Sequence, residues 1–193
     1  MAKSNFQISA EYWVARTVLT LYGALPRSLA IGLGRSLGRL AYLLPTRLRR
    51  TGLRNLEIAF PELSLTEQKR LLRGSFDSLG RLLGEFSQFP RLTRERLRQM
   101  IEYDQVGLAH LRTAEAEHRG VIFLTGHLGS WEILSFGWSA LEYPLSFLVR
   151  PIDNARIEEL IESRRTRFGN VAIDKKMAAR AALRVLREGK TLG

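Results

Sequence analysis

Two histidines in the sequence are each followed five positions later by a glutamate: His110 by Glu115, and His127 by Glu132. A carboxylate that accepts the proton of one imidazole nitrogen fixes the tautomer and raises the basicity of the other nitrogen. That second nitrogen can then take a proton from a substrate hydroxyl. One such spacing by chance is unremarkable in a chain with three histidines and many acidic residues. The sequence around each pair must therefore show which of the two could be catalytic.

The sequence around the two pairs differs. His110 lies in the polar stretch 111–117, which is most simply a solvated helix. His127 closely follows 121–124, a short continuous apolar run that is typical of a buried parallel strand. Residues five apart point about 140° apart on a helix, so the second pair can meet only if His127 lies in a loop and Glu132 in the helix after it.

Small and polar residues between the strand and the helix favour such a loop. Gly126 and Gly129 allow a tight turn, and Ser130 can cap the helix. The helix N-terminus would offer backbone N–H donors to a developing oxyanion. Two interpretations remain open at this point: general-base catalysis on a substrate hydroxyl, or a histidine that a carboxylate satisfies for structural reasons alone.

The second half of the chain alternates between strand and helix patterns. The predicted strands are 121–124, 145–149 and 171–173, and the predicted helices are 131–141, 154–168 and 177–188. This alternation predicts an α/β fold with a parallel sheet and flanking helices. Residues 189–193 look like the turn into a further strand, so we expect the sheet to be truncated at the C-terminus and the chain to be a fragment of a longer protein.

Residues 1–60 are apolar and basic, with nine cations and two anions. Arginines interrupt every apolar run before it reaches the ~18 residues of a spanning helix. The pattern suits interfacial membrane helices whose cations meet lipid phosphates, although a buried helical layer with a solvated basic rim is the alternative. Pro26 and Pro45 should delimit helices over 8–24 and 27–44. We therefore divide the chain into a membrane-associating region, 1–60, and an α/β domain, 61–193, that is helical over 61–119.

Two further patterns bear on packing. Ser64 and Glu67 form a capping-box signal for a helix whose buried face should run to Phe89 and include Leu72, Phe76, Leu79, Leu83 and Phe86. Residues 34–38 match the G-x-S-x-G pattern of hydrolase nucleophiles, but no strand precedes them. Glycines at a close helix–helix contact explain that match better.

Composition limits the possible chemistry. The 193 residues contain no cysteine, which excludes disulfides, thiolate zinc sites, iron–sulfur clusters and cysteine nucleophiles. Neither a ligand cluster nor a complete dinucleotide fingerprint appears, so no metal and no organic cofactor is expected. The net charge is +11, with arginine supplying 25 of the 30 cations, which predicts an anionic partner: nucleic acid, an acidic membrane or a phosphorylated substrate.

The string from Gly120 to Glu132 resembles the signature block of the bacterial lipid A late acyltransferases, the lauroyl/myristoyl transferase family of the lysophospholipid acyltransferase superfamily. That superfamily is defined by a histidine, four residues and an acidic residue. Further blocks agree in order along the chain: 54–62, Glu85, 149–154 and 165–169. The resemblance implies a lysophospholipid/glycerol-3-phosphate acyltransferase-like α/β fold behind a helical, membrane-associating N-terminus.

The resemblance also implies a reaction. A fatty acyl group would move from an acyl thioester, on acyl carrier protein or CoA, to a hydroxyl of a glycolipid or lysophospholipid. His127 would be the general base and Glu132 the residue that orients it. The family uses a downstream arginine toward substrate phosphate or active-site electrostatics; Arg165 matches that block best, with Arg167 and Arg150 as alternates. The resemblance implies a place at the cytoplasmic face of the bacterial inner membrane.

Two other classes of protein remain as alternatives. A basic nucleic-acid-binding protein would suit the charge, but no recognisable binding motif is present and no aromatic residues interleave the later basic segments, so no nucleic acid is expected. A non-catalytic lipid-binding protein would use His127 only structurally.

Overall fold

The computed structural model describes residues 3–44, 46–174 and 178–193. It forms two compact units, one made of residues 19–89 and the other of residues 1–18 with 90–193. The sequence-based division between residues 60 and 61 stays a prediction. Pro45 and Met177, which the sequence places at helix ends, lie outside the described residues.

The unit of residues 19–89 is helical. It contains the end of α1 (Asn5–Ala24) and three further helices, α2 (Arg27–Leu43), α3 (Arg47–Ala59) and α4 (Leu65–Ser87). The two N-terminal helices therefore lie where the sequence predicts them. α4 begins at the predicted capping box: the hydroxyl of Ser64 accepts from the backbone N–H of Glu67, whose carboxylate accepts from the backbone N–H of Ser64 at 2.9 Å.

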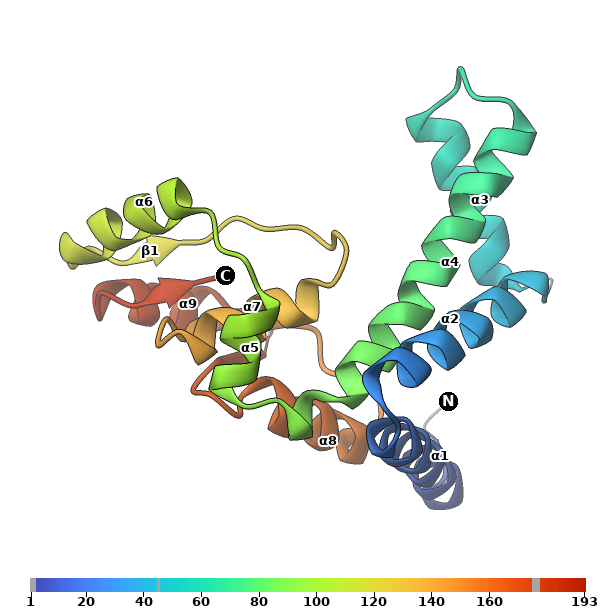
Figure 1. Ribbon diagram of the computed structural model, residues 1–193, viewed down its shortest axis with the longest axis horizontal. Coiled ribbons are helices and arrows are strands. Elements are labelled where there is room, and N and C mark those ends of the chain that lie inside the picture. Colours follow the sequence, from blue (N-terminus) through green and yellow to red (C-terminus); the bar gives the residue numbers. More distant parts are fainter. Residues whose placement is uncertain (1–2, 45, 175–177) are drawn as a thin grey trace. The chain divides into compact units, whose positions relative to one another are not determined.

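Helices α2 and α4 lie side by side (Figure 1), and they meet through glycines. A Cβ atom on Gly34 or Gly38 would clash with the backbone oxygen of Gly80 or Phe76, respectively. Gly84 stands equally close to the backbone of Ala30. The interpretation of the G-x-S-x-G match as a packing feature is therefore confirmed.

The glycine contact also corrects the predicted buried face of α4. Leu72 and Phe86 are buried as expected, but Leu79 is 53% exposed. Because backbones approach most closely at Gly80 and Gly84, the contact line runs along the glycines, and the neighbouring leucine turns aside.

The two sides of α2 differ in character. Its arginines point toward acids of α4, with distances of 2.9 Å for Arg27–Glu85, 2.8 Å for Arg35–Asp77 and 2.5 Å for Arg39–Asp77. Burial raises the pKa of Asp77, but its hydrogen bonds to the two arginines outweigh burial and hold the pKa below the ordinary value. On the other side, five leucines are 43% to 68% exposed: Leu29, Leu33, Leu37, Leu40 and Leu43.

The other unit contains the sheet. Its elements after residue 90 are α5 (Arg94–Met100), α6 (Gln105–Ala116), β1 (Val121–Ile122), α7 (Trp131–Ala140), β2 (Leu145–Val149), α8 (Ala155–Arg165), β3 (Val171–Asp174), α9 (Ala178–Arg187) and β4 (Thr191–Leu192), with a 3-10 turn η1 (Phe89–Arg91) at the boundary. All strand pairs are parallel, and the spatial order is β1-β4-β2-β3. The predicted α/β class with flanking helices is therefore correct.

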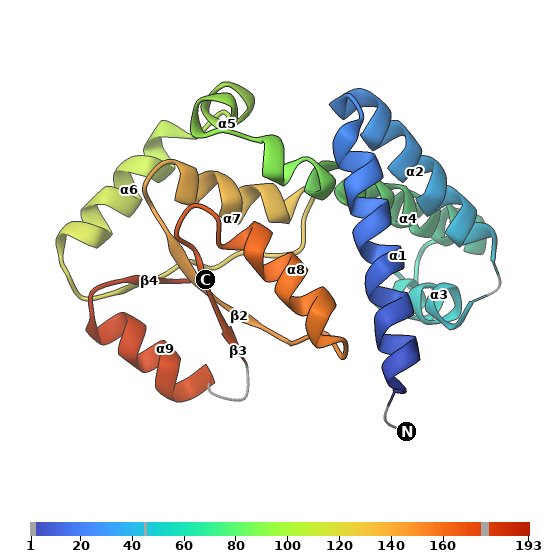
Figure 2. The ribbon, with the colours of Figure 1, turned by 90° about the horizontal axis from the view of Figure 1, so that it is seen from below.

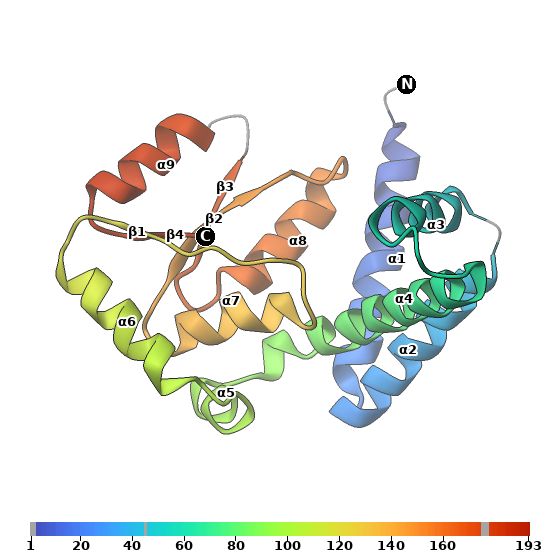
Figure 3. The same cartoon turned by 90° about the horizontal axis from the view of Figure 1, so that it is seen from above.

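The order of the strands decides which helix covers which face. The connections through α7 and α8 run one way across the sheet, and the connection through α9 runs back. Because such crossovers are right-handed, α7 and α8 pack on one face and α9 on the other, as Figures 2 and 3 show. Among the described helices, none combines the length and apolar character needed to cross a membrane.

The first strand differs from the prediction. Residues 121–124 are expected to form a buried strand, but β1 has only two residues and lies at an edge of the four described strands. Ile122 is 68% exposed and Leu124 is 93% exposed. The reason is the position of β4, which lies between β1 and β2, so that Thr191 and Leu192 take the buried central place.

Candidate functional site

A cavity of about 180 Å³ lies between the sheet and α7. His127, Glu132 and Arg165 line it together. Its other walls are mostly apolar and include Phe123, Trp131, Leu134, Leu145, Phe147, Leu148 and Val149. The loop after β1 and the last residue of β2 both contribute, which places the cavity toward the carboxyl edge of the sheet, where α/β proteins bind ligands.

The best-defined contact in the cavity is an ion pair between Glu132 and Arg165. Glu132 lies in the first turn of α7 and is 8% exposed. The Nε of Arg165 donates to Oε2 of Glu132 at 2.8 Å, and its Nη2 donates to Oε1. This fork-to-carboxylate geometry fixes both side chains. Arg165 ends α8, where the helix dipole favours a cation.

His127 lies on the loop and is exposed. Its ring makes an edge contact with Trp131, with 5.0 Å between the ring centroids. Within the described part of the chain, no hydrogen bond joins His127 to Glu132. The sequence predicts that this carboxylate orients the imidazole, whereas here it binds Arg165, because a planar guanidinium engages both carboxylate oxygens at once. Ser130 stands at the N-cap of α7 but makes no side-chain cap hydrogen bond.

The other two predicted substrate arginines lie outside the cavity lining. Arg167 donates through Nη1 to the carbonyl oxygens of Pro90 at 2.7 Å and Leu92 at 3.1 Å, so it braces the backbone beside η1. Arg150 is exposed and directly follows Val149, which does line the cavity. Arg165 is therefore the arginine that the structure brings to the two predicted catalytic residues.

The second His–Glu pair, His110 and Glu115, does not line the cavity. His110 is exposed on α6. Glu115 accepts a hydrogen bond at 3.2 Å from the hydroxyl of Thr191 on the central strand β4. This carboxylate thus ties α6 to the sheet, away from the cavity lining.

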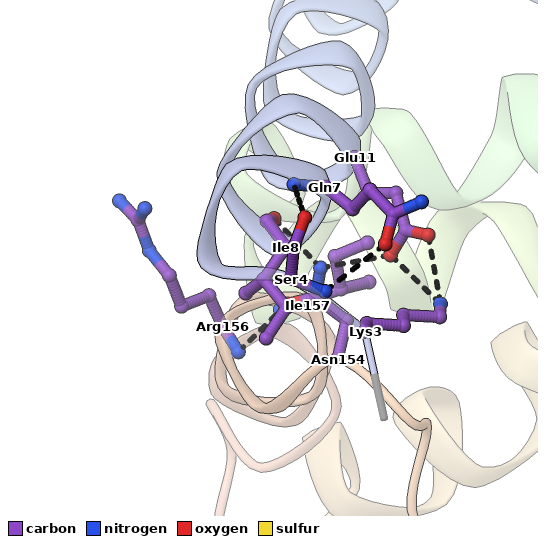
Figure 4. Close-up of polar contacts among 8 residues, drawn as sticks. All are labelled: Lys3, Ser4, Gln7, Ile8, Glu11, Asn154, Arg156 and Ile157. Carbon is purple, nitrogen blue, oxygen red and sulfur yellow. Dashed lines mark hydrogen bonds and ion pairs between the residues drawn. The ribbon is translucent and has the colours of Figure 1, made fainter. Parts of the chain in front are cut away.

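The prediction from sequence missed Asn154, which is 1% exposed and holds the helix that carries Arg165 (Figure 4). Its Oδ1 caps α8 by accepting from the backbone N–H groups of Arg156 and Ile157. Its Nδ2 donates to the carbonyl oxygen of Ile8 at 2.8 Å and to Glu11 at 3.0 Å, both on α1. An asparagine just before a helix signals an N-cap, but no local pattern reveals the bonds to α1.

The contacts of Asn154 continue into the first turns of α1. Lys3 binds Glu11 at 2.7 Å, and the bonds from Lys3 and Asn154 lower the pKa of Glu11. The guanidinium of Arg156 lies over the ring of Tyr12, with 3.9 Å from its carbon to the centroid. α8 is therefore anchored to α1 at its N-terminus and to α7 through Arg165 at its C-terminus.

The cavity that His127, Glu132 and Arg165 line at the carboxyl edge of the parallel sheet lies where α/β proteins bind ligands. Residues 2–193 match the family described as bacterial lipid A biosynthesis acyltransferase. The chain belongs to this family, which confirms the resemblance stated from its motifs.

Individual relatives agree with the family match. The chain is 30% identical over 185 residues to a lipid A biosynthesis lauroyltransferase of Escherichia coli (strain K12). It is 28% identical over 180 residues to a lipid A biosynthesis palmitoleoyltransferase of the same organism and to a lipid A biosynthesis acyltransferase of Shigella flexneri. Each match covers 93% of this chain and 58% of the relative, so the chain spans under two thirds of their length.

Proposed function

We propose that the protein transfers a fatty acyl chain from an acyl thioester to a hydroxyl of a lipid A precursor. The donor would be acyl carrier protein or acyl-CoA, and the acceptor a glycolipid. The observation that carries this proposal is the cavity itself, in which His127, Glu132 and Arg165 stand among apolar side chains. Such walls suit an acyl chain, and the three polar groups stand where its reacting end would lie.

His127 is proposed as the general base. Its imidazole takes the proton from the acceptor hydroxyl as the hydroxyl oxygen attacks the thioester carbonyl carbon and forms the new C–O bond. The negative charge on the carbonyl oxygen is stabilised by backbone N–H groups at the N-terminus of α7. Collapse of this adduct breaks the C–S bond, and the imidazolium returns its proton to the departing sulfur. The products are an ester and a free thiol.

Glu132 and Arg165 are proposed as an ion pair beside that base that is already formed before substrate binds. Arg165 holds the Glu132 carboxylate in place, and a carboxylate has lone pairs left after binding a guanidinium. When substrate draws His127 inward, its ring N–H can donate to Glu132, which fixes the tautomer. The flanking Gly126 and Gly129 permit this movement of the loop, since neither has an atom within 4 Å of a Cβ position.

We further propose a place at the cytoplasmic face of the inner membrane, and the leucine side of α2 supports contact with a membrane surface. Five exposed leucines on one side of one helix form an apolar surface that water does not favour. Shallow insertion of such a face into the boundary between headgroups and acyl chains buries it without a spanning helix. The basic residues of α3, among them Arg47 and Arg50, would then meet lipid phosphates.

Replacement of the base tests the reaction. We expect His127→Ala to lower acyl transfer by roughly 10²- to 10⁴-fold, the usual contribution of a general base. The matched control is His110→Ala, which removes an exposed histidine of the same spacing pattern and should leave the rate unchanged. The assay is mass spectrometry of the acceptor lipid after incubation with an acyl thioester.

The outcomes separate the classes of function. Equal turnover by both variants would refute the mechanism. Lipid binding without turnover by the unaltered protein would identify a binding-only protein. A mobility shift with nucleic acid that weakens steeply with salt, without liposome binding, would favour the nucleic-acid alternative.

A further inference from the structure

Helix α9 presents a row of arginines that the proposed reaction does not use. Arg180, Arg184 and Arg187 are all exposed. At 3.6 residues per turn they fall within about 60° of one another and span about 10 Å along the helix. Ala181 and Val185 of α9 line a groove against the sheet with Val171 and Ile173, and Arg184 borders the same groove.

These arginines have no acidic partner in the part of the chain that the structure describes: no carboxylate oxygen lies within 4.0 Å of any of them. The nearest acid along the helix is Glu188, whose carboxylate is bound by Lys190 at 2.6 Å. The bond from Lys190 and, to a smaller extent, the charge of Arg184 lower the pKa of Glu188. The positive charge of the row is therefore not neutralised within the described residues.

The helix dipole favours two arginines of the row, because Arg184 and Arg187 lie in the last turn of α9. Arg180 lies in the first turn of α9, next to the positive end of the helix dipole, and that turn has no acidic residue. A cation there is unfavourable, typically by a few tenths of a kcal/mol. Local stability therefore does not explain Arg180, whereas an external anion would account for all three arginines at one-turn intervals.

The exposed residues of α9 indicate which class of anionic partner would bind the row of arginines. Leu183, at 54%, is the one large exposed apolar side chain of α9, so the helix lacks the apolar face that an interfacial helix inserts into lipid. It has no aromatic residue on which bases could stack. Carboxylates one turn apart on an acidic helix match the spacing of the guanidiniums, and bidentate pairing favours arginine for this purpose.

We propose that the row Arg180–Arg184–Arg187 is the docking surface for an acidic carrier protein that delivers the acyl thioester. The proposal rests on the proposed function, since it names the partner that supplies the donor. α9 covers the face of the sheet opposite to the cavity, so a carrier bound there would deliver the thioester around the carboxyl edge of the sheet. β3 ends at Asp174 and α9 begins at Ala178, so Arg180 lies toward the carboxyl edge of the sheet, the edge at which the cavity also lies.

The test compares two donors that differ only in the carrier. The variant is the triple replacement Arg180→Gln, Arg184→Gln and Arg187→Gln. The matched control removes three exposed arginines of the same unit, through Arg96→Gln, Arg98→Gln and Arg119→Gln. Acyl transfer is measured with acyl carrier protein thioester and with the corresponding acyl-pantetheine, which has the same thioester and no acidic protein.

We expect the α9 variant to raise KM for the carrier-bound donor about tenfold or more while kcat stays within about twofold, because peripheral charges act mainly on encounter. KM for acyl-pantetheine should not change, and the control variant should behave as the unaltered protein. Added salt should abolish the difference between the two proteins. An unchanged KM for the carrier-bound donor, or an equal rise for both donors, would overturn the proposal.

A direct measurement of binding tests the proposal without depending on turnover. Calorimetric titration with acyl carrier protein should show binding that the α9 variant loses and the control retains, even if no acyl transfer is detected. Loss of binding to anionic vesicles or to nucleic acid, with carrier binding intact, would assign the row to that other partner and refute the proposal.

Discussion

Helices α2 and α9 carry three arginines each but use them in opposite ways. Those of α2 face α4 and are bound by Asp77 and Glu85, while leucines face outward. Those of α9 are exposed and have no acidic partner among the described residues, and Arg184 also borders the groove that Ala181 and Val185 line against the sheet. Equal charge on two amphipathic helices therefore implies different partners: a lipid surface for the leucines of α2 and an acidic surface for the arginines of α9.

The difference qualifies the use of net charge as a guide to function. The basic N-terminal third suggests cations that meet lipid phosphates, yet Arg27, Arg35 and Arg39 neutralise acids within the helical unit. An arginine that is already paired gives an external anion little to bind. Charge indicates a partner only after internal pairs are subtracted.

Replacing a glycine at the contact between α2 and α4 should give the largest loss of stability that we expect. In Gly34→Ala the new methyl group would clash with the backbone oxygen of Gly80. Because backbone cannot move aside as a flexible side chain does, the unfolding free energy should fall by about 3 kcal/mol or more. Urea denaturation followed by circular dichroism measures it.

Gly32→Ala on the same helix is the matched control. Nothing lies within 4 Å of its Cβ position, and alanine is the better helix former. This variant should gain about 0.5–1 kcal/mol. Equal effects of the two replacements would show that the glycine contact does not hold α2 to α4.

The outward side of α2 gives the next largest effect. The triple replacement Leu33→Gln, Leu37→Gln and Leu40→Gln removes exposed apolar groups and should weaken binding to anionic vesicles by about two orders of magnitude, at roughly 1 kcal/mol for each partly inserted side chain. Stability in solution should change little, because the three side chains are 43% to 56% exposed. Vesicle flotation measures the binding.

The Arg180–Arg184–Arg187 glutamine variant is the comparison for that experiment. It removes three charges and no apolar group, and it should retain most of the vesicle binding. If it lost as much as the leucine variant, the contrast between the two helices would fail.

Much of this arrangement follows from local pattern in the sequence. Periodicity and prolines located α1 and α2, the Ser64–Glu67 box located the start of α4, and the position of His127 after a strand located the cavity. These features depend on neighbours along the chain, so the sequence displays them directly.

Features that join distant segments were not predictable in the same way. Nothing local shows that β4 enters between β1 and β2, which leaves Ile122 exposed at an edge. Likewise, the partner of Glu132 is Arg165, 33 positions away, although the residues around each were singled out. Long-range pairing decides which of two suitable partners a carboxylate takes.

The smallest effect that we expect is the pH dependence of stability that results from the ion pairs of Arg35 and Arg39 with Asp77. Arg35 and Arg39 hold the pKa of Asp77 below its ordinary value of 3.8, so the folded protein keeps this carboxylate charged more readily than the unfolded chain. The resulting stability is present above the unfolded pKa and is lost as pH falls through the lowered folded pKa. Asp77→Asn should therefore cost ~1 kcal/mol or less near neutral pH, because both guanidiniums are about half exposed.

That cost should shrink below about pH 4 and vanish once Asp77 is protonated in both states. Arg184→Gln is the control on α9: because Arg184 has no ion pair to lose within the described part of the chain, the replacement should change stability by no more than a few tenths of a kcal/mol across the same range. Thermal unfolding between pH 3 and 7 gives both curves. An Asp77→Asn difference that did not depend on pH would mean that the charge of Asp77 does not help to hold α2 to α4. The contrast between the paired Arg35 and Arg39 of α2 and the arginines of α9, which have no acidic partner in the described ranges, would then lose its energetic basis.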